Sequence, residues 1–189
     1  MTKLNRAEQE MISEIVIPKK KIVSFKKILA GKDVNCILDY DDSCWSMLML
    51  AIWFNFTKGI EYLIQQKCDL TYKSPGGMNS ILIATHKNNP AMIETLVSGG
   101  VDINQANDKG LTSLMLASEK NNIDVFQKLI DLGAKTDLRD KQGHGWKDYS
   151  KEDSAFRQTL LLQDCLKEGL LLQDCLKEGK PRPPEKGRM

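Results

Sequence analysis

Histidine and cysteine carry much of the nucleophilic, acid–base and metal chemistry of proteins, and this sequence has few of them. Its two histidines, His86 and His144, lie far apart along the chain. The sequence contains no HExxH, CxxC, GxSxG, Walker or GxGxxG pattern. It therefore provides no nucleophile–base pair and no recognisable set of metal ligands, and we expect no enzyme activity, no cofactor and no metal site.

The cysteines do not indicate a disulfide framework. Five of them stand at positions 36, 44, 68, 165 and 175, an odd number, and the polar stretch Met1–Glu10 has no secretory character. This usage favours a reducing compartment, so we expect the cytoplasm, with the nucleus or delivery into a host cytosol as alternatives. The longest apolar run, Met47–Phe54, has eight residues, whereas a bilayer crossing needs about 18–20, so we expect no membrane partner.

The charge distribution argues against nucleic acid as the partner. The chain has 189 residues, 41% hydrophobic and 28% charged, which is typical of a folded globular protein. Residues 1–32 carry eight basic and three acidic residues, net +5, and residues 180–189 carry four and one, net +3. Between them, residues 33–179 carry fifteen basic and twenty-one acidic residues, net −6. An acidic body lacks the broad basic surface that phosphate binding needs.

An internal repeat, with a period of about 33 residues, determines which elements could position a site. Glycines recur in two columns, Gly77, Gly110 and Gly143 in one and Gly100 and Gly133 in the other. Six columns hold apolar residues of like type in all three copies: Leu48, Ile81 and Leu114; Leu50, Ile83 and Leu116; Ala51, Ala84 and Ala117; Ile60, Ile93 and Phe126; Leu63, Leu96 and Leu129; Ile64, Val97 and Ile130.

Each copy predicts two helices and a turn. In the third copy, the apolar residues of 114–117 fit one face of a short helix, and those of 125–130 follow the spacing of a second amphipathic helix. Gly133 suits the left-handed residue that ends this helix, and a polar turn leads to the next copy. One such unit cannot bury both of its helices, so the copies must stack.

These features resemble the ankyrin repeat family. The sequence DKGLTSLMLA at 108–117 is similar to the family's D-x-x-G-x-T-P-L-H-x-A signature, and VSGGVDIN at 97–104 is similar to its L-L-x-x-G-A-D-V-N close. The resemblance covers about residues 23–153 and implies an all-α, ankyrin-type solenoid of helix–loop–helix repeats with short hairpin turns. No copy has the Pro or the His of the family's T-P-L-H, so we expect these repeats to be less stable than consensus ones.

The resemblance also divides the chain. We expect an N-terminal helical capping unit at 1–36, with helices at 2–17 and 19–30, and ankyrin repeats at 37–153. The repeats would occupy about 41–73, 74–106 and 107–139, with a partial copy at 140–153. We expect a C-terminal helical cap at 154–179 and a disordered, basic, Pro-rich tail at 180–189. The cap contains LLLQDCLKEG twice in succession, at 160–169 and 170–179, and the second copy is either a duplication that packs poorly or a further helix for a partner.

In ankyrin-like arrays, the hairpin tips and the exposed side of the first helices form one concave face that binds partner proteins. Two tryptophans fall at such positions, which the core does not require. The alternative is that these aromatic residues pack against the N-terminal unit. Carried over residue by residue, the partner-binding positions are Asp42, Trp45, Trp53, Phe54, Met78, His86, Lys87, Asp108, Lys109, Leu111, Glu119, Lys120 and Lys141.

We therefore expect a protein–protein interaction module whose concave face masks or tethers a partner protein. Trp45, Trp53 and Phe54 would be the anchors, because tryptophan is enriched in binding hot spots. Two finer alternatives remain open. One is a microbial or viral effector that occludes a host or defence protein, and the other is an adaptor that holds a second protein through its C-terminal helices.

Overall fold

The computed structural model describes residues 5–12, 17, 19, 21–35, 37–40 and 43–150. Asp42, the expected C-terminal cap at 154–179 with its repeated decapeptide, and the tail at 180–189 lie outside the described residues. The elements are the helices α1 (Arg6–Met11), α2 (Ile22–Leu29), α3 (Met47–Trp53), α4 (Thr57–Gln65), α5 (Ser80–His86), α6 (Pro90–Ser98), α7 (Ser113–Glu119), α8 (Ile123–Asp131) and α9 (Trp146–Tyr149), and the strands β1 (Ile37–Tyr40) and β2 (Ser43–Ser46).

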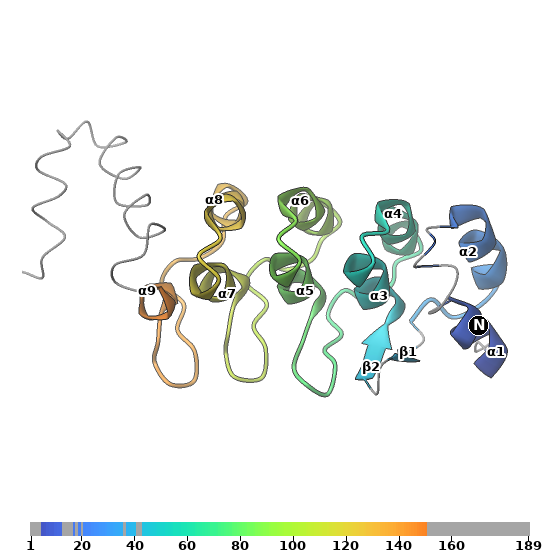
Figure 1. Cartoon of the computed structure of the whole chain (residues 1–189), viewed down its shortest axis with the longest axis horizontal. Helices are drawn as coiled ribbons and strands as arrows, with labels where there is room; N and C mark the ends of the chain where they lie inside the picture. The colour runs from blue at the N-terminus through green and yellow to red at the C-terminus, as the bar shows by residue number, and fades with distance from the viewer. Residues whose placement is uncertain are drawn as a thin grey trace, which may run out of the picture.

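The helices form two rows (Figure 1). The first helices of the three repeats, α3, α5 and α7, follow one another in one row, which the short helix α9 continues. The second helices α4, α6 and α8 lie above them, and long turns extend on the opposite side. The all-α solenoid predicted from the repeat is confirmed. It has one addition, because β1 and β2 pair as a two-stranded antiparallel sheet in which Leu38 faces Trp45.

The first helices are the most buried elements of the array. Every residue is buried in Met47–Ile52 of α3, Ser80–Thr85 of α5 and Ser113–Ser118 of α7. The second helices bury only one stripe, for example Met92, Ile93 and Leu96 in α6. Each first helix is therefore enclosed by its own second helix and by the neighbouring first helices, as stacking of repeats requires.

Each first helix begins at a capped N-terminus although the family's Pro is absent. The side chains of Ser46, Asn79 and Thr112, which hold the same place in successive copies, accept hydrogen bonds from the amides of Met49, Leu82 and Met115. Such caps satisfy helix N–H groups that have no partner within the helix.

In the loop between the two helices of each repeat, an asparagine recurs at the same position. Asn55, Asn88 and Asn121 all adopt left-handed backbone, with φ of 55°, 53° and 52°. Asparagine tolerates this conformation better than other side chains that carry a Cβ. The column fixes the reversal between first and second helix.

The turns that lead into α7 and α9 are closed by the side chain at their first residue. In one of them, the Oδ1 atom of Asn107 accepts hydrogen bonds from the amides of Lys109 and Leu111. Asp140 holds the corresponding place in the next turn, with bonds from the amides of Gln142 and His144. Asn107, and not Asp108, therefore fills the first position of the signature, and Asp108 is exposed.

The N-terminal unit packs on the first repeat through aromatic residues. Its helices α1 and α2 lie within the expected ranges of 2–17 and 19–30 and are shorter than those ranges. The ring of Phe25 in α2 meets Phe56 edge-to-face at 5.5 Å and Tyr62 at 6.1 Å. Phe56 precedes α4 where asparagines precede α6 and α8, and it makes no side-chain cap. The first repeat thus has an aromatic contact with α2 in place of a cap.

The backbone at Lys67 is expected to be strained, because it is left-handed at a residue that carries a Cβ. Lys67 has φ of 56°, and Gly100 and Gly133 hold the equivalent positions of the next two copies with φ of 99° and 88°. A left-handed residue with a Cβ is disfavoured by about 1–2 kcal/mol relative to glycine, partly offset by glycine's greater freedom in the unfolded chain. We expect Lys67→Gly to raise the free energy of unfolding by about 1 kcal/mol in urea denaturation.

Gly133→Lys is the matched reverse change, because open space surrounds the place where its Cβ would lie. It should lower the free energy of unfolding by a similar amount. Equal stability of the Lys67→Gly variant and the unaltered chain would show that Lys67 carries no backbone strain.

Candidate functional site

The buried first helices leave only their C-terminal ends at the surface. In α3, α5 and α7, the last residue and the one after it are half-buried or exposed, whereas the preceding six residues are buried. These residues can vary without changing the core, and several are among the positions predicted from the family register. They are Trp53 and Phe54, His86 and Lys87, and Glu119 and Lys120.

An aromatic and basic cluster connects the first repeat to the second. The rings of Trp45 and Trp53 meet edge-to-face with centroids 5.4 Å apart. The ring of His86 lies 6.1 Å from that of Trp53 at an angle of 32°, and the Nζ atom of Lys87 lies 4.4 Å from the Trp53 centroid. We call Trp45, Trp53, His86 and Lys87 the aromatic cluster. A cation over a tryptophan face holds both side chains in place.

The ring contacts of Trp53 lie partly within the first repeat and partly toward the second. Its neighbours Trp45, His86 and Lys87 belong to β2 and to the end of α5. Phe25 of the N-terminal unit contacts two other aromatic residues, Phe56 and Tyr62. Trp45, Trp53 and Phe54 are nevertheless half-buried and pack against the core, so part of their area also stabilises the fold.

A groove of about 780 Å³ continues the same side of the array toward its C-terminal end. Its walls come from three successive turns, from the last residue of α7 and from α9. The main-chain amide of Lys141 donates a 3.0 Å hydrogen bond to the carbonyl of Lys109, which links two of these turns directly. The lining residues are Pro75, Gly76, Asn107, Asp108, Lys109, Leu111, Glu119, Asp140, Lys141, Gln142 and Tyr149.

The structure thus gathers the predicted residues in two places. Trp45, Trp53, His86 and Lys87 meet in the aromatic cluster, and Lys120 influences His86 electrostatically. Phe54 and Met78 are half-buried against the core and do not line the groove, and Asp42 lies outside the described residues. The other predicted residues, Asp108, Lys109, Leu111, Glu119 and Lys141, line the groove.

The family register missed several polar residues of the groove, among them Asp140 and Tyr149. Tyr149 falls in the column of Leu50, Ile83 and Leu116, which predicts a core residue, but its hydroxyl donates a 2.7 Å hydrogen bond to Asp140. The polar tip of a tyrosine in a leucine column was the available signal, because a buried hydroxyl needs a partner.

The hydrogen bond between Tyr149 and Asp140 shifts the pKa values of both groups. Donation by Tyr149 is the main cause that lowers the pKa of Asp140, with further bonds from the amides of His144 and Gln142. Burial first, and then the bond to Asp140, raises the pKa of Tyr149 to about 12. The carboxylate of Asp140 thus contacts two main-chain amides, the hydroxyl of Tyr149 and the imidazole of His144, and its side chain is only 4% exposed. These contacts hold the turn together, so we interpret Asp140 as a structural residue and not as a reactive group.

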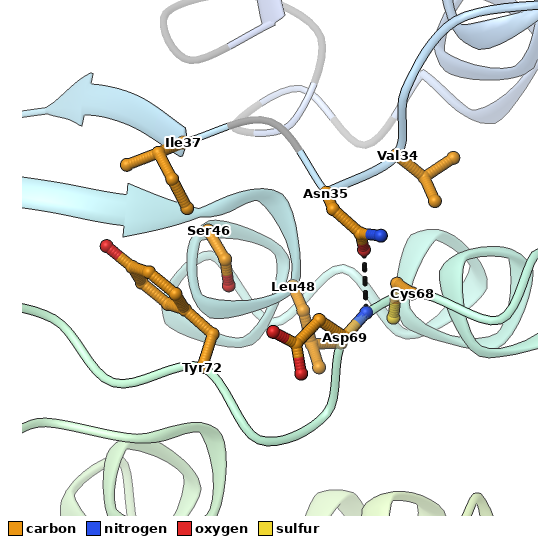
Figure 2. Close-up of a pocket in the computed structure, with 8 residues that line it drawn as sticks. All are labelled: Val34, Asn35, Ile37, Ser46, Leu48, Cys68, Asp69 and Tyr72. Carbon is orange, nitrogen blue, oxygen red and sulfur yellow. Dashed lines mark hydrogen bonds between the residues drawn. The ribbon is translucent and has the colours of Figure 1, made fainter. Parts of the chain in front are cut away.

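A smaller cavity lies at the junction of the N-terminal unit and the first repeat (Figure 2). Its volume is about 20 Å³, enough for one water molecule. The amide of Asp69 donates a 2.6 Å hydrogen bond to Asn35 across it, and burial raises the pKa of the neighbouring Cys68 thiol to about 11. A thiol with a raised pKa is a poor nucleophile at neutral pH, so this cavity does not form a reactive site.

The described part of the chain contains neither a candidate metal site nor a candidate membrane span. Histidine, cysteine and acidic side chains do not gather there in groups of three or more that could hold a metal ion. None of the helices in that part has both the length and the apolar character that crossing a membrane demands.

A stack of helix–loop–helix units with an accessible row of turns defines a repeat protein of the solenoid class. The family model described as ankyrin repeats (3 copies) matches residues 48–140. The matched segment therefore belongs to the ankyrin repeat family, whose repeats are protein–protein interaction modules. No curated protein matches the chain.

The electrostatics of the aromatic cluster predict a titration shift. Burial is the first cause that lowers the pKa of His86, and the positive charges of Lys120 and Lys87 lower it further. Removing one of these charges should therefore raise the pKa of His86 toward its ordinary value of about 6.5. We expect Lys120→Gln to do so in an NMR titration of the imidazole resonances.

Lys109→Gln is the control, because Lys109 is not among the groups that shift His86. It should leave the His86 titration unchanged. Identical His86 titrations in the unaltered chain and the Lys120→Gln variant would contradict the placement of Lys120 beside the cluster.

Proposed function

We propose that the array binds a partner protein through its concave face, defined here as the aromatic cluster, the C-terminal ends of α5 and α7 and the groove along the turns. The observation that carries this proposal is the continuity of these features along one side of three successive repeats. Glu119 belongs to the groove and occupies the same repeat position as Trp53 and His86, two members of the cluster. A partner that follows this side would meet both in one interface.

The energetic argument rests on the tryptophan pair. Tryptophan combines a large apolar area with few rotatable bonds, and each anchor in an interface contributes about 2 kcal/mol or more. Trp45 and Trp53 hold each other edge-to-face, so little side-chain freedom remains to be lost on binding. Phe54, Met78 and Leu111 would add flanking apolar contacts, and the charged residues Asp42, Asp108, Lys109, Glu119, Lys120 and Lys141 would set orientation and partner choice.

The groove is suited to binding because its walls are fixed before a partner arrives. Side chains close the turns at Asn107 and Asp140, and main-chain hydrogen bonding joins one turn to the next at Lys141. A preformed surface avoids most of the ordering cost that a loop would incur on association. Such a rigid surface would mask the part of the partner that it covers, or tether it.

We do not assign an enzymatic step to this face. Its groups with shifted pKa values have structural explanations. Asp140 and Tyr149 bond each other, and burial, together with the charges of Lys120 and Lys87, lowers the pKa of His86. The finer alternatives, an adaptor or an effector, are versions of the same binding proposal. The segments 154–179 and 180–189 that an adaptor needs lie outside the described residues.

The cysteines favour the cytoplasm as the place of action. Cys44 and Cys68 are free thiols, and Cys68 is buried in the first repeat. Buried free thiols suit a reducing compartment. Measuring the fraction of each thiol oxidised in cells, by differential alkylation, would test this assignment.

The binding proposal predicts the result of affinity capture. We expect the unaltered chain to capture a partner protein and the double variant Trp45→Ala/Trp53→Ala to lose most of it, by about tenfold or more for two anchors. Quantitative mass spectrometry of the captured proteins measures the loss.

Tyr62→Ala is the matched control. Tyr62 is also half-buried and has a lysine over its ring, Lys26 at 5.1 Å, but it lies on the second helix α4. Thermal melting of both variants corrects for lost packing. Retention of the partner by the tryptophan variant, or equal loss in both variants, would contradict binding through the concave face.

A further inference from the structure

The charges at the centre of the concave face indicate what the partner presents to it. Building on the proposed function, we infer that the partner contributes an acidic segment, with Asp or Glu side chains next to an apolar side chain. The carboxylates would contact Lys87 and Lys120, which we call the basic pair. The apolar side chain would lie against Trp45 and Trp53.

The basic pair is placed by the repeat itself. Lys87 and Lys120 occupy the same position in successive copies, each directly after the last residue of a first helix, α5 and α7. Because α5 and α7 pack side by side, the two lysines follow the ends of neighbouring helices in adjacent repeats. Burial, and after it the charges of Lys120 and Lys87, lower the pKa of His86, which agrees with this placement.

Helix ends explain part of this pattern. A lysine at a helix C-terminus is favoured by the partial negative charge there. That interaction does not require the Nζ atom of Lys87 to lie 4.4 Å from the Trp53 ring centroid. The arrangement joins a positive charge to an apolar surface, which matches a carboxylate beside an apolar side chain.

The basic pair also has no internal carboxylate partner in the described part of the chain. Two other lysines do form ion pairs, Lys128 with Glu94 at 2.7 Å and Lys32 with Glu8 at 3.1 Å. Neither Lys87 nor Lys120 forms an ion pair with any carboxylate that the structure describes. A carboxylate of the partner would therefore meet positive charges that no carboxylate of the described chain neutralises.

The surroundings favour a protein segment over a nucleic acid. The groove that continues from the basic pair exposes Asp108 and Glu119, and residues 33–179 as a whole have a net charge of −6. A phosphate backbone that follows the groove would meet these carboxylates, whereas a peptide can place a few acidic residues at the basic pair only.

Peptide selection tests this inference without a known partner. Random dodecapeptides displayed on phage are selected on the immobilised full chain, on the charge-reversed variant Lys87→Glu/Lys120→Glu, and on Lys27→Glu/Lys58→Glu. The last variant is the control, because it changes the net charge equally at exposed lysines of α2 and α4. Circular dichroism melting confirms that each variant is folded.

We expect the unaltered chain and the control to enrich Asp and Glu at least about twofold over the unselected library. The charge-reversed variant should enrich Lys and Arg instead. An enriched acidic peptide should bind the charge-reversed variant at least about tenfold more weakly in fluorescence anisotropy. A wild-type pool without acidic enrichment, or one that charge reversal leaves unchanged, overturns the inference.

A selection on Trp53→Ala separates this inference from the proposed function. Loss of the peptides with Trp53→Ala, together with an unchanged composition after charge reversal, retains the concave face and overturns the acidic segment. Retention of the same peptides by Trp53→Ala places their site elsewhere and contradicts the proposed function. Tighter binding of a single-stranded oligonucleotide than of the peptides, dependent on Lys87 and Lys120, overturns the inference in favour of nucleic acid.

Discussion

The enclosure of the first helices is the constraint on which the rest of the structure depends. Six successive residues are buried in each of α3, α5 and α7, so no side of these helices is exposed to solvent along those residues. Stability must therefore come from interfaces between neighbouring units, as in other linear arrays. The same enclosure confines surface variation to the ends of the helices, where Trp53, His86 and Glu119 succeed one another. The packing requirement thus determines where recognition can occur.

The sequence predicts the repeating part of this architecture well and the junctions poorly. Columns such as Leu63, Leu96 and Leu129 predict the buried stripe of the second helices, because every copy faces the same environment. Tyr149 is an exception. It falls in a column of apolar core residues, but the turn at Asp140 gives its hydroxyl a hydrogen-bond partner that the column does not predict. The hairpin of β1 and β2 has no counterpart in the later copies, so no comparison between copies could predict it.

The candidate site is predicted only in part for a related reason. The register identifies Trp53 and His86 as surface positions one period apart, but their contact depends on how one repeat is offset against the next. That offset arises from the packing of α3 against α5 and is not a property of either copy alone. Likewise, a shift of one residue in reading the turn exchanges Asn107 with Asp108. The hydrogen bonds distinguish the two residues, because Asn107 closes the turn and Asp108 stays exposed.

The departures from the repeat pattern concentrate where the aromatic residues lie. Only the first of the three copies has Lys67 in place of a left-handed glycine, and only there is the second helix preceded by Phe56 without a side-chain cap. The same copy carries Trp45 and Trp53. Natural sequences break local rules mainly where function or a neighbouring element demands it. Phe56 has such a reason in its contact with Phe25. The tryptophan pair also packs against the core, but later copies hold Met78, His86, Leu111 and Glu119 at the same repeat positions. The repeat therefore does not require aromatic residues there, and this is the physical reason why we propose the first repeat as the centre of recognition.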